Sequence, residues 1–253
     1  DRLACIEAVA RIGGNHPDAI PALIELAHQQ TLSTDGEQER REAAVDGLAL
    51  VGTQASPAVP TLIRLTREDS GRLRTKAAVA LGAIGPAAEI SADALVDLML
   101  FDDLPEVRQA AAESLATIGD SGIAALQKLL SDEDVTVRRL AAIGLGQVVR
   151  TTDSVTESLR LALDDNDPDV RLTAAESHWK TAEDGDAVVP VLLSTVTSAD
   201  RQLRIRAYRL LISLGPSAKP AIPELERLTN DDRQYVRQVA RTALRELRLP
   251  TVT

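Results

Sequence analysis

Apolar residues recur along this chain at the period of an α-helix, in a unit of about 33 residues. Each copy begins with an arginine and places apolar side chains three, four, seven and ten residues later, on one face of a helix. The leading arginines stand at spacings of 39, 33, 34, 30, 33, 33 and 33 residues. They are Arg2, Arg41, Arg74, Arg108, Arg138, Arg171, Arg204 and Arg237. The recurrence predicts a tandem repeat protein.

Turn residues divide each unit into two helices. A glycine ends the first helix, where a left-handed residue is needed, at Gly52, Gly85, Gly119 and Gly215. A second helix then starts among prolines that its first turn tolerates, at Pro21, Pro60, Pro190 and Pro223. Its predicted buried residues include Ile20, Leu23, Leu26, Val59, Leu62, Leu65, Ile222, Leu225 and Leu228. Acidic turns precede the next arginine, and Asp167-Pro168 is typical of a helix N-cap.

The pairs Val107-Arg108, Val137-Arg138, Val170-Arg171 and Val236-Arg237 match the Val-Arg of the pattern Asp-x-x-Val-Arg-x-x-Ala-Ala-x-x-Leu-Gly-x-Ile-Gly. This pattern resembles HEAT repeats, in particular the short phycobilin-lyase-like type. The resemblance implies a right-handed, all-α solenoid whose second helices line a concave face. It also implies that each repeated arginine reaches an acidic turn. We expect one domain over residues 1–253, with repeats starting near 1, 40, 73, 107, 137, 170, 203 and 236, and a last single helix over about 232–247.

Composition limits which side chains can fill the interior and in which compartment the protein is expected. Hydrophobic residues make up 44% of the chain but aromatic residues only 2%, so alanine, leucine, valine and isoleucine must fill thin layers between helices. Cys5 replaces an alanine of the motif and is expected to be a buried small residue, neither in a disulfide nor on a metal. No run approaches the roughly 18 apolar residues of a membrane span. We expect a soluble protein, with the cytoplasm favoured. Because Asp1 lies inside a repeat and the sequence does not begin with methionine, we expect either a processed product or a part of a longer protein.

Charge is distributed unevenly along the chain. The net charge is -10, but residues 200–253 hold 11 lysines and arginines against 6 acidic residues. Overall acidity argues against general nucleic-acid binding, and only the last two repeats could attract phosphates. Their arginines at helical spacing form either the polar outer face that caps a repeat array or an anion-binding stripe: Arg233, Arg237, Arg241 and Arg245.

Stacked repeats bury their apolar faces against neighbours and leave long surfaces open, which favours a non-catalytic scaffold that binds a protein or peptide. The repeat numbering predicts one outward position on each second helix, at Glu25, Arg64, Asp97, Lys128, Leu161, Ser194 and Arg227. We predict that these residues form the partner site, with Leu161 as its central apolar contact. An ordinary solvated face is the alternative. The expected partner is a protein or peptide bound by a monomer.

Three irregular features remain open at this point. Trp179, the only tryptophan, is either a binding anchor or the filling of one irregular layer. The polar segment 29–36 makes the first repeat longer and is either a contact loop or a tolerated insertion. Met99, Leu100, Phe101 and Leu104 place apolar bulk in a turn that is charged elsewhere, so they either form an exposed interface or fold back under the turn.

Motifs that could carry chemistry are incomplete. Asp165, Asp167, Asp169 and Glu176 imitate a calcium loop, but Val170 occupies the position that requires glycine. Gly119-Asp120-Ser121-Gly122 and Ser177-x-x-Lys180 lack the partners that a nucleophile needs. No histidine is followed by glutamate, so the paired motifs of deoxyhypusine hydroxylase are missing. We therefore expect no cofactor, no metal and no catalysis; the alternative that the resemblance suggests is phycobilin-lyase-like handling of a chromophore or other small ligand.

Overall fold

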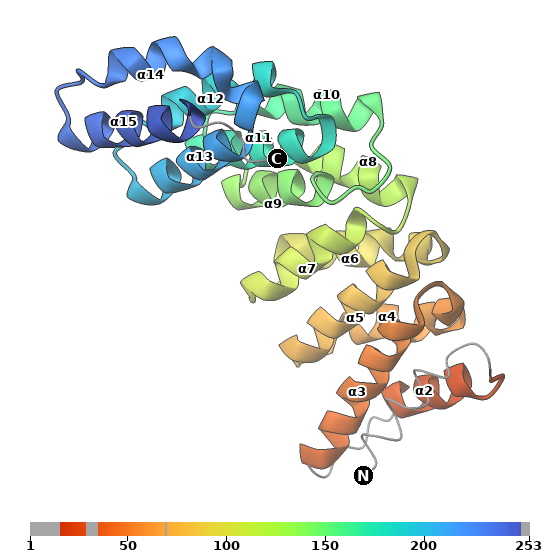
Figure 1. Cartoon of the computed structure of the whole chain (residues 1–253). Helices are drawn as coiled ribbons and strands as arrows, with labels where there is room; N and C mark the ends of the chain where they lie inside the picture. The colour runs from red at the N-terminus through yellow and green to blue at the C-terminus, as the bar shows by residue number, and fades with distance from the viewer. Residues whose placement is uncertain (1–15, 29–34, 69, 249–253) are drawn as a thin grey trace. The chain divides into compact units, whose positions relative to one another are not determined.

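The structure is a computed structural model that describes residues 16–28, 35–68 and 70–248. These residues form helices and turns, and no strand occurs among them (Figure 1). The first helices of the repeats are α3 (Asp35–Val51), α5 (Gly71–Ile84), α7 (Pro105–Leu115), α9 (Val135–Leu145), α11 (Pro168–Ala182) and α13 (Arg201–Ser213). The second helices are α2 (Ala19–His28), α4 (Val59–Leu65), α6 (Ala92–Phe101), α8 (Asp120–Leu129), α10 (Asp153–Ala162), α12 (Gly185–Thr195) and α14 (Ile222–Leu228).

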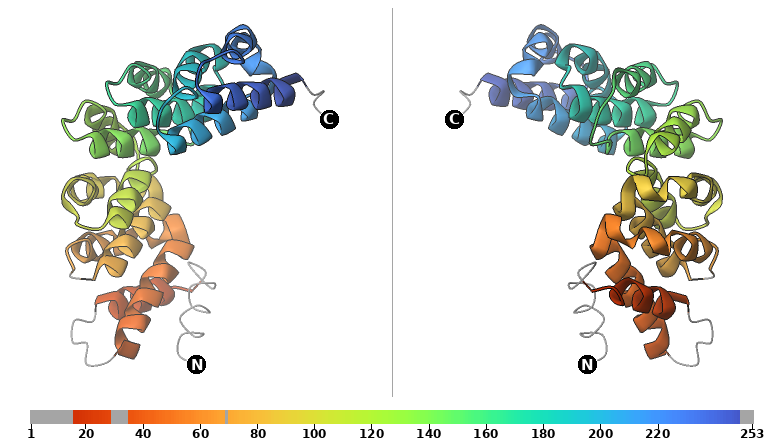
Figure 2. Two further views of the ribbon diagram at one scale, coloured as in Figure 1. Left: turned by 90° about the vertical axis from the view of Figure 1, so that its left-hand side faces the viewer. Right: turned by 90° about the vertical axis from the view of Figure 1, so that its right-hand side faces the viewer.

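The predicted all-α solenoid of helical hairpins is confirmed. Helix α15 (Gln234–Arg248) is the expected last single helix. The first helices lie on one side and the second helices on the other, within each part of the chain (Figures 1 and 2). Arg2, Cys5 and residues 29–34 of the polar insertion lie outside the described residues.

The chain divides into two compact units, and each is described here by itself. The first comprises Asp1–Asp132 with Gln147–Val149, and the second comprises Glu133–Gly146 with Arg150–Thr253. The repeat pattern of the sequence runs through this division without interruption, from the copy led by Arg108 to the copy led by Arg138. The single domain over residues 1–253 therefore stays a prediction.

The apolar stripe of the first helices is the core. In α5 the four motif positions Ala77, Ala78, Leu81 and Ile84 are completely buried. The glycine that ends the stripe takes a positive φ in all four predicted copies, with φ of 65° at Gly52 and 72° at Gly85. Only glycine adopts this conformation without a steric cost, so the glycines end the first helices. A 3₁₀ segment follows in three repeats: η2 (Gly52–Ala58), η3 (Gly85–Ser91) and η4 (Gly215–Ala221).

Some details of the second helices differ from expectation. Ile20, Leu26 and Ile222 are only half-buried. In α2 the buried stripe is Ala19, Leu23 and Ala27, because residues four apart lie on one face of a helix. Pro190 does not lie in a first turn: Asp184 caps α12 by accepting a hydrogen bond from the Ala187 amide at 3.2 Å, so the helix starts at Gly185.

The repeated arginines bond to the turns that separate one repeat from the next. Arg74 donates to Asp102 at 2.6 Å and 2.8 Å, and Arg138 donates to Asp165 at 2.7 Å and 3.0 Å. Arg41 likewise reaches Glu68 at 2.6 Å. The arginines of the later repeats instead donate to backbone carbonyls of the turn before their own helix, as Arg204 does to Ser198. The expected ion pair with an acidic turn thus forms in some repeats. In others the arginine bonds instead to backbone carbonyls of the turn before its helix.

Residues 71–101 are long and apolar enough to cross a membrane by length and composition alone, and 44% of their most apolar window is buried. The structure shows this segment as α5, η3 and α6, broken where Gly85 takes its positive φ. Helices α5 and α6 have 14 and 10 residues, each shorter than the roughly 20 that a bilayer requires. The segment forms the helical hairpin of the third repeat.

Candidate binding groove between α13 and α15

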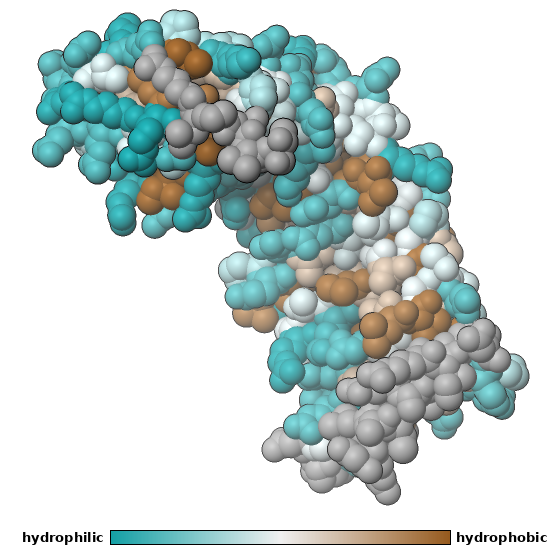
Figure 3. Space-filling view, viewed as in Figure 1, coloured by the Kyte–Doolittle hydropathy of each residue, from teal (hydrophilic) through white to brown (hydrophobic). Residues whose placement is uncertain are grey.

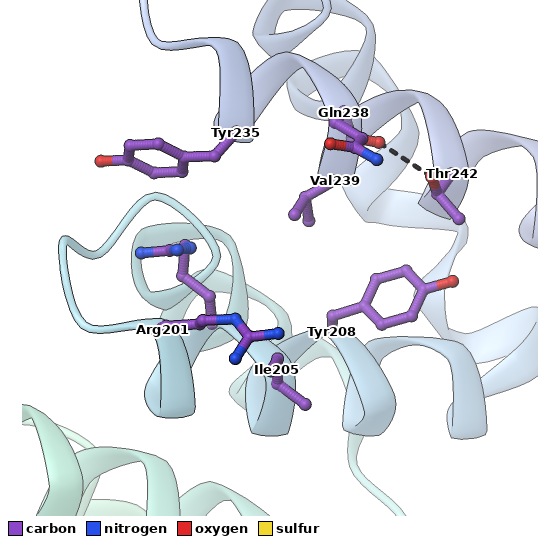
Figure 4. Close-up of a pocket in the computed structure, with 8 residues that line it drawn as sticks. Arg201, Ile205, Tyr208, Tyr235, Gln238, Val239 and Thr242 are labelled. Atoms are coloured by element: carbon purple, nitrogen blue, oxygen red, sulfur yellow. Dashed lines mark hydrogen bonds between the residues drawn. The ribbon is translucent and has the colours of Figure 1, made fainter.

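An open groove of about 350 Å³ lies between the first helix of the last hairpin and the terminal helix (Figure 4). Each helix contributes a stripe of four residues from two successive turns. The stripes are Arg201, Arg204, Ile205 and Tyr208 on α13, and Tyr235, Gln238, Val239 and Thr242 on α15. Tyr235 and Tyr208 lie at opposite ends, with Val239 and Ile205 between them. Both tyrosines of the chain therefore line this groove.

Two positions on α13 hold larger residues than the same positions in most other first helices. Four residues after the repeated arginine, Val45, Ala78, Ala112, Ala142 and Ala175 are completely buried. The same position holds the half-buried Tyr208 in α13. At other contacts between first helices the backbones approach closely: a Cβ on Gly82 would lie 2.8 Å from Ser114 Oγ, and one on Gly146 would lie 2.4 Å from Ser177 Oγ. The position of Gly82 and Gly146 is taken by Ile212 in α13.

Arginines surround the ring of Tyr235. The Arg204 guanidinium carbon lies 4.1 Å from the ring centroid, and that of Arg233 lies 5.9 Å from it. Both distances suit a cation–π contact. Arg233 also pairs with Asp231 at 2.9 Å and donates to the carbonyl of Thr197. One end of the groove is thus held in place before any ligand arrives.

Arg201 differs from these arginines because it has no hydrogen-bond or ion-pair partner within residues 16–28, 35–68 and 70–248. It is exposed and lines the groove. As the first residue of α13 it stands where the helix dipole disfavours a positive charge.

Neighbouring groups shift the pKa of Tyr208, which lines the groove, and of Asp231, which pairs with Arg233. Burial raises the pKa of Tyr208, and the nearby Glu246 carboxylate raises it further. Hydrogen bonds from the Arg233 side chain and backbone lower the pKa of Asp231 to about 2. Tyr208 is therefore a neutral hydrogen-bonding group and Asp231 a carboxylate at neutral pH.

The outward positions predicted on the second helices are exposed, except for the half-buried Arg64. Glu25, Arg64, Asp97 and Lys128 belong to the first unit, and Leu161, Ser194 and Arg227 to the second. Arg64 contacts His28, and Arg227 pairs with Glu224 at 2.5 Å. Leu161 is 60% exposed. Their place on a concave face and their role in binding stay predictions.

The four arginines predicted as a cap or stripe do not form a uniform row of available cations. Arg233 pairs with Asp231, Arg237 donates to the carbonyls of Asp231 and Asp232, and Arg245 pairs with Glu246 at 3.0 Å. Arg241 is exposed. The buried face of α15 consists of Val236, Ala240, Ala243 and Leu244.

The structure clarifies one of the irregular features, the apolar turn, and leaves the role of Trp179 open. Trp179 is half-buried on α11, which decides neither packing nor binding. Met99 is completely buried whereas Phe101 is 79% exposed. Phe101 lines a shallow hollow of about 370 Å³ beside Asp97 and Arg67. The apolar turn therefore folds back in part and is exposed in part.

The acidic residues that imitate a calcium loop serve the helices instead. Asp167 caps α11 by accepting hydrogen bonds from the amides of Asp169 and Val170. Asp165 pairs with Arg138, and Asp169 and Glu176 pair with Arg206. No cluster of three metal-ligating side chains occurs in the part of the chain that the structure describes. Ser177 is buried at its contact with Gly146.

Exposed apolar residues are scattered on the side shown in Figure 3, where separate hydrophobic patches lie among hydrophilic side chains. The groove differs from such patches because it combines apolar, aromatic and cationic groups in one hollow. Of the residues that line the groove, sequence reasoning named only Arg204, as a repeated arginine and not as a binding residue. The available signal was that both tyrosines fall on α13 and α15 at positions that are small or polar in other copies.

Comparison with known protein families agrees with the repeat geometry. HEAT repeats match residues 29–116, 92–179 and 156–245, which together cover most of the chain. The chain belongs to the HEAT repeat family. A PBS lyase HEAT-like repeat also matches residues 1–29. The HEAT repeats thus extend over both compact units. A search of curated proteins finds no match.

Of three solved structures that resemble this chain, the mutant of Kap121p shows the same fold. A mutant of Kap121p is 12% identical, with a TM-score of 0.59, over 91% of this chain and 29% of that protein. The Escherichia coli protein YibA is 18% identical, with a TM-score of 0.48, over 98% of this chain and 96% of that one. The complex of CpcE and CpcF of phycocyanin lyase from Nostoc sp. PCC7120 is 21% identical, with a TM-score of 0.48 and coverages of 91% and 88%. At these identities the likeness concerns the fold alone.

Proposed function

We propose that this HEAT repeat chain is a non-catalytic interaction module that holds a segment of another protein in the groove between α13 and α15. The observation that carries the proposal is the lining of the groove: two tyrosines, two apolar side chains and an arginine without a partner among the described residues. Aromatic residues and arginine are the side chains that most often dominate binding energy at protein interfaces. A volume of about 350 Å³ is at the lower end of ligand sites, so a short segment of chain fits it.

The second helices offer a further surface for such a partner. Leu161 is an exposed leucine at the outward position of α10, in the set that the repeat numbering predicts. Lys128 and Asp97, at the same position in other repeats, are exposed as well. We propose that this set forms a second contact with the partner, in which Leu161 is the central apolar contact and the charged positions affect mainly the rate of association.

The proposal can be tested by filling the groove. Val239→Trp places a large ring between Ile205 and Tyr208, and Val149→Trp is the matched control because Val149 is 89% exposed and lies outside the groove. A random peptide library displayed on phage is selected on the parent chain. We expect selected peptides to lose at least about tenfold in affinity for Val239→Trp and none for Val149→Trp. If no selected peptide distinguishes the two variants, the groove is not the binding site.

A further inference from the structure

We infer that the segment held in the α13/α15 groove is acidic: it places a carboxylate against Arg201 and an apolar side chain against Ile205 and Val239. This inference rests on the proposed function and adds the chemistry of the partner. Its basis is the way in which this contact between first helices departs from the others in the same chain.

At several other contacts between first helices, one helix supplies acids for the cations of its neighbour. Lys76 of α5 pairs with Asp46 of α3, and Arg72 of α5 lies 3.2 Å from Glu42 of α3. Arg206 of α13 pairs with Glu176 of α11 at 2.7 Å. Hydrogen bonds to Glu176 and Asp169 outweigh the burial of Arg206 and raise its pKa. Cations at these contacts are therefore neutralised within the fold.

The contact between α13 and α15 lacks such acids. Helix α13 contains four arginines and no acidic residue, and α15 contains four arginines and Glu246 alone. No ion pair joins the two helices in the described part of the chain. Glu246, the one acid on these helices, pairs with Arg245 on the same helix. The groove is thus a site where the repeat leaves positive charge for another molecule to neutralise.

The acidity of the whole chain does not cancel this local charge. The net charge is -10, but interactions between exposed charges fade beyond a Debye length of about 10 Å at 0.1 M salt. Acids close to these helices in the sequence are engaged within the fold: Asp231 with Arg233, Glu246 with Arg245, and Asp200 with the Gln202 and Leu203 amides at the start of α13. An approaching acidic segment therefore meets mainly the arginines of α13 and α15.

The lining favours a peptide over a nucleic acid. Of the arginines on these helices, Arg206 and Arg245 are paired with acids, Arg204 and Arg237 donate to backbone carbonyls, and the exposed Arg209 and Arg241 do not line the groove. Binding to a phosphate backbone needs several available cations in a row, and the groove presents only Arg201. Bases stack on open aromatic faces, but Arg204 already covers a face of Tyr235 at 4.1 Å.

The dimensions define the length of the segment. From Arg201 to Tyr208 the α13 stripe spans two turns, which is about 10 Å at 1.5 Å per residue. An extended chain advances about 3.3 Å per residue, so about three residues lie in the groove. Arg201 near one end and Tyr208 at the other fix the direction in which the carboxylate must point.

The test uses the full chain and fluorescein-labelled heptapeptides in fluorescence anisotropy. One peptide alternates glutamate with leucine, and a second replaces each glutamate with glutamine. The variants are Arg201→Gln and, as a matched control with the same loss of charge, Lys219→Gln, since Lys219 is exposed on η4 outside the groove. Val239→Trp reports whether binding uses the groove at all.

We expect the parent chain to bind the glutamate peptide about tenfold more tightly than the glutamine peptide, since a hydrogen bond to a charged group contributes about that factor. Arg201→Gln should remove the difference, and Lys219→Gln should keep it. Higher salt should weaken the glutamate peptide selectively.

Other outcomes separate the inference from the proposed function. If both peptides bind equally and both are lost in Val239→Trp, the acidic partner is refuted while the groove keeps its function. If neither peptide responds to Val239→Trp, both conclusions fall. If a 20-nucleotide oligothymidylate binds more tightly than the glutamate peptide and depends on Arg201, the partner is a nucleic acid and the inference is wrong.

Discussion

The ion pair between Arg74 and Asp102 should contribute more to stability than any exposed pair of this chain. Arg74 Nε lies 2.6 Å from one carboxylate oxygen of Asp102, and Nη2 lies 2.8 Å from the other. The two side chains are only 13% and 3% exposed. Asp102 also accepts a hydrogen bond from the Leu104 amide at 3.0 Å. Asp102→Asn keeps the shape but turns an amide donor toward the guanidinium donors.

The expected cost can be bounded from these contacts. Removing one partner of a buried ion pair costs about 3–5 kcal/mol. Asp103, which is 83% exposed, remains 2.9 Å from Arg74 and compensates in part, so we expect about 2–4 kcal/mol for Asp102→Asn. The control is Glu224→Gln, which removes the exposed pair with Arg227 and should cost about 0–1 kcal/mol.

The pH dependence provides a second check. Burial opposes ionisation of Asp102, but the hydrogen bonds from Arg74 and Leu104 outweigh it, so the pKa lies below the 3.8 of a free aspartate. A carboxyl group with a lowered pKa stabilises the fold above its unfolded pKa, and this stabilisation is lost as the pH falls through the folded value. The difference between the parent chain and Asp102→Asn should therefore be complete at neutral pH and shrink below about pH 4.

Urea unfolding followed by circular dichroism measures the difference, and hydrogen exchange at the α5 amides reports it locally, because units of a repeat array can unfold separately. The reasoning is refuted if Asp102→Asn costs no more than Glu224→Gln. It is also refuted if the cost stays constant from pH 7 to the acid limit of folding.

Three further substitutions test the fold and the second-helix surface. Glu183, at φ 52°, is the only non-glycine residue with positive φ in the described chain. Glu183→Gly should therefore stabilise the protein by about 1 kcal/mol in thermal unfolding. An equal gain for Glu183→Ala would contradict the backbone explanation. Gly146→Ala should lower the free energy of unfolding by about 1–3 kcal/mol because its Cβ would meet Ser177. Gly36→Ala is the control and should not lower it, since nothing lies within 4 Å of its Cβ. Equal effects in urea unfolding would disprove the close contact. Leu161→Asp should change stability by less than about 0.5 kcal/mol because Leu161 is 60% exposed, yet weaken a captured partner more than Glu25→Lys does. Unchanged binding would remove Leu161 from the site.

The segment Met99-Leu100-Phe101 shows that the burial of single residues could not be predicted from the sequence. The composition of this segment indicated apolar bulk in a turn, but not that Met99 is completely buried while Phe101 is 79% exposed. The last turn of α6 decides this, because neighbouring residues on a helix point in different directions. Similarly, because Asp184 caps α12, this helix begins earlier than predicted and contains Pro190.

Local patterns were sufficient for the repeats themselves. Periodicity, glycine at the end of each first helix and aspartate before the next one are properties of a single helix and its caps, so the sequence alone determined the hairpins, the positive φ of Gly52, Gly85, Gly119 and Gly215, and the capping by Asp167. The groove is different because its two stripes lie 34 residues apart in the sequence, as Arg201 and Tyr235 do. Tyr208 lines it only where α13 lies against α15, and within the described residues no ion pair joins these two helices. Such a site depends on distances between helices, which only the tertiary structure decided.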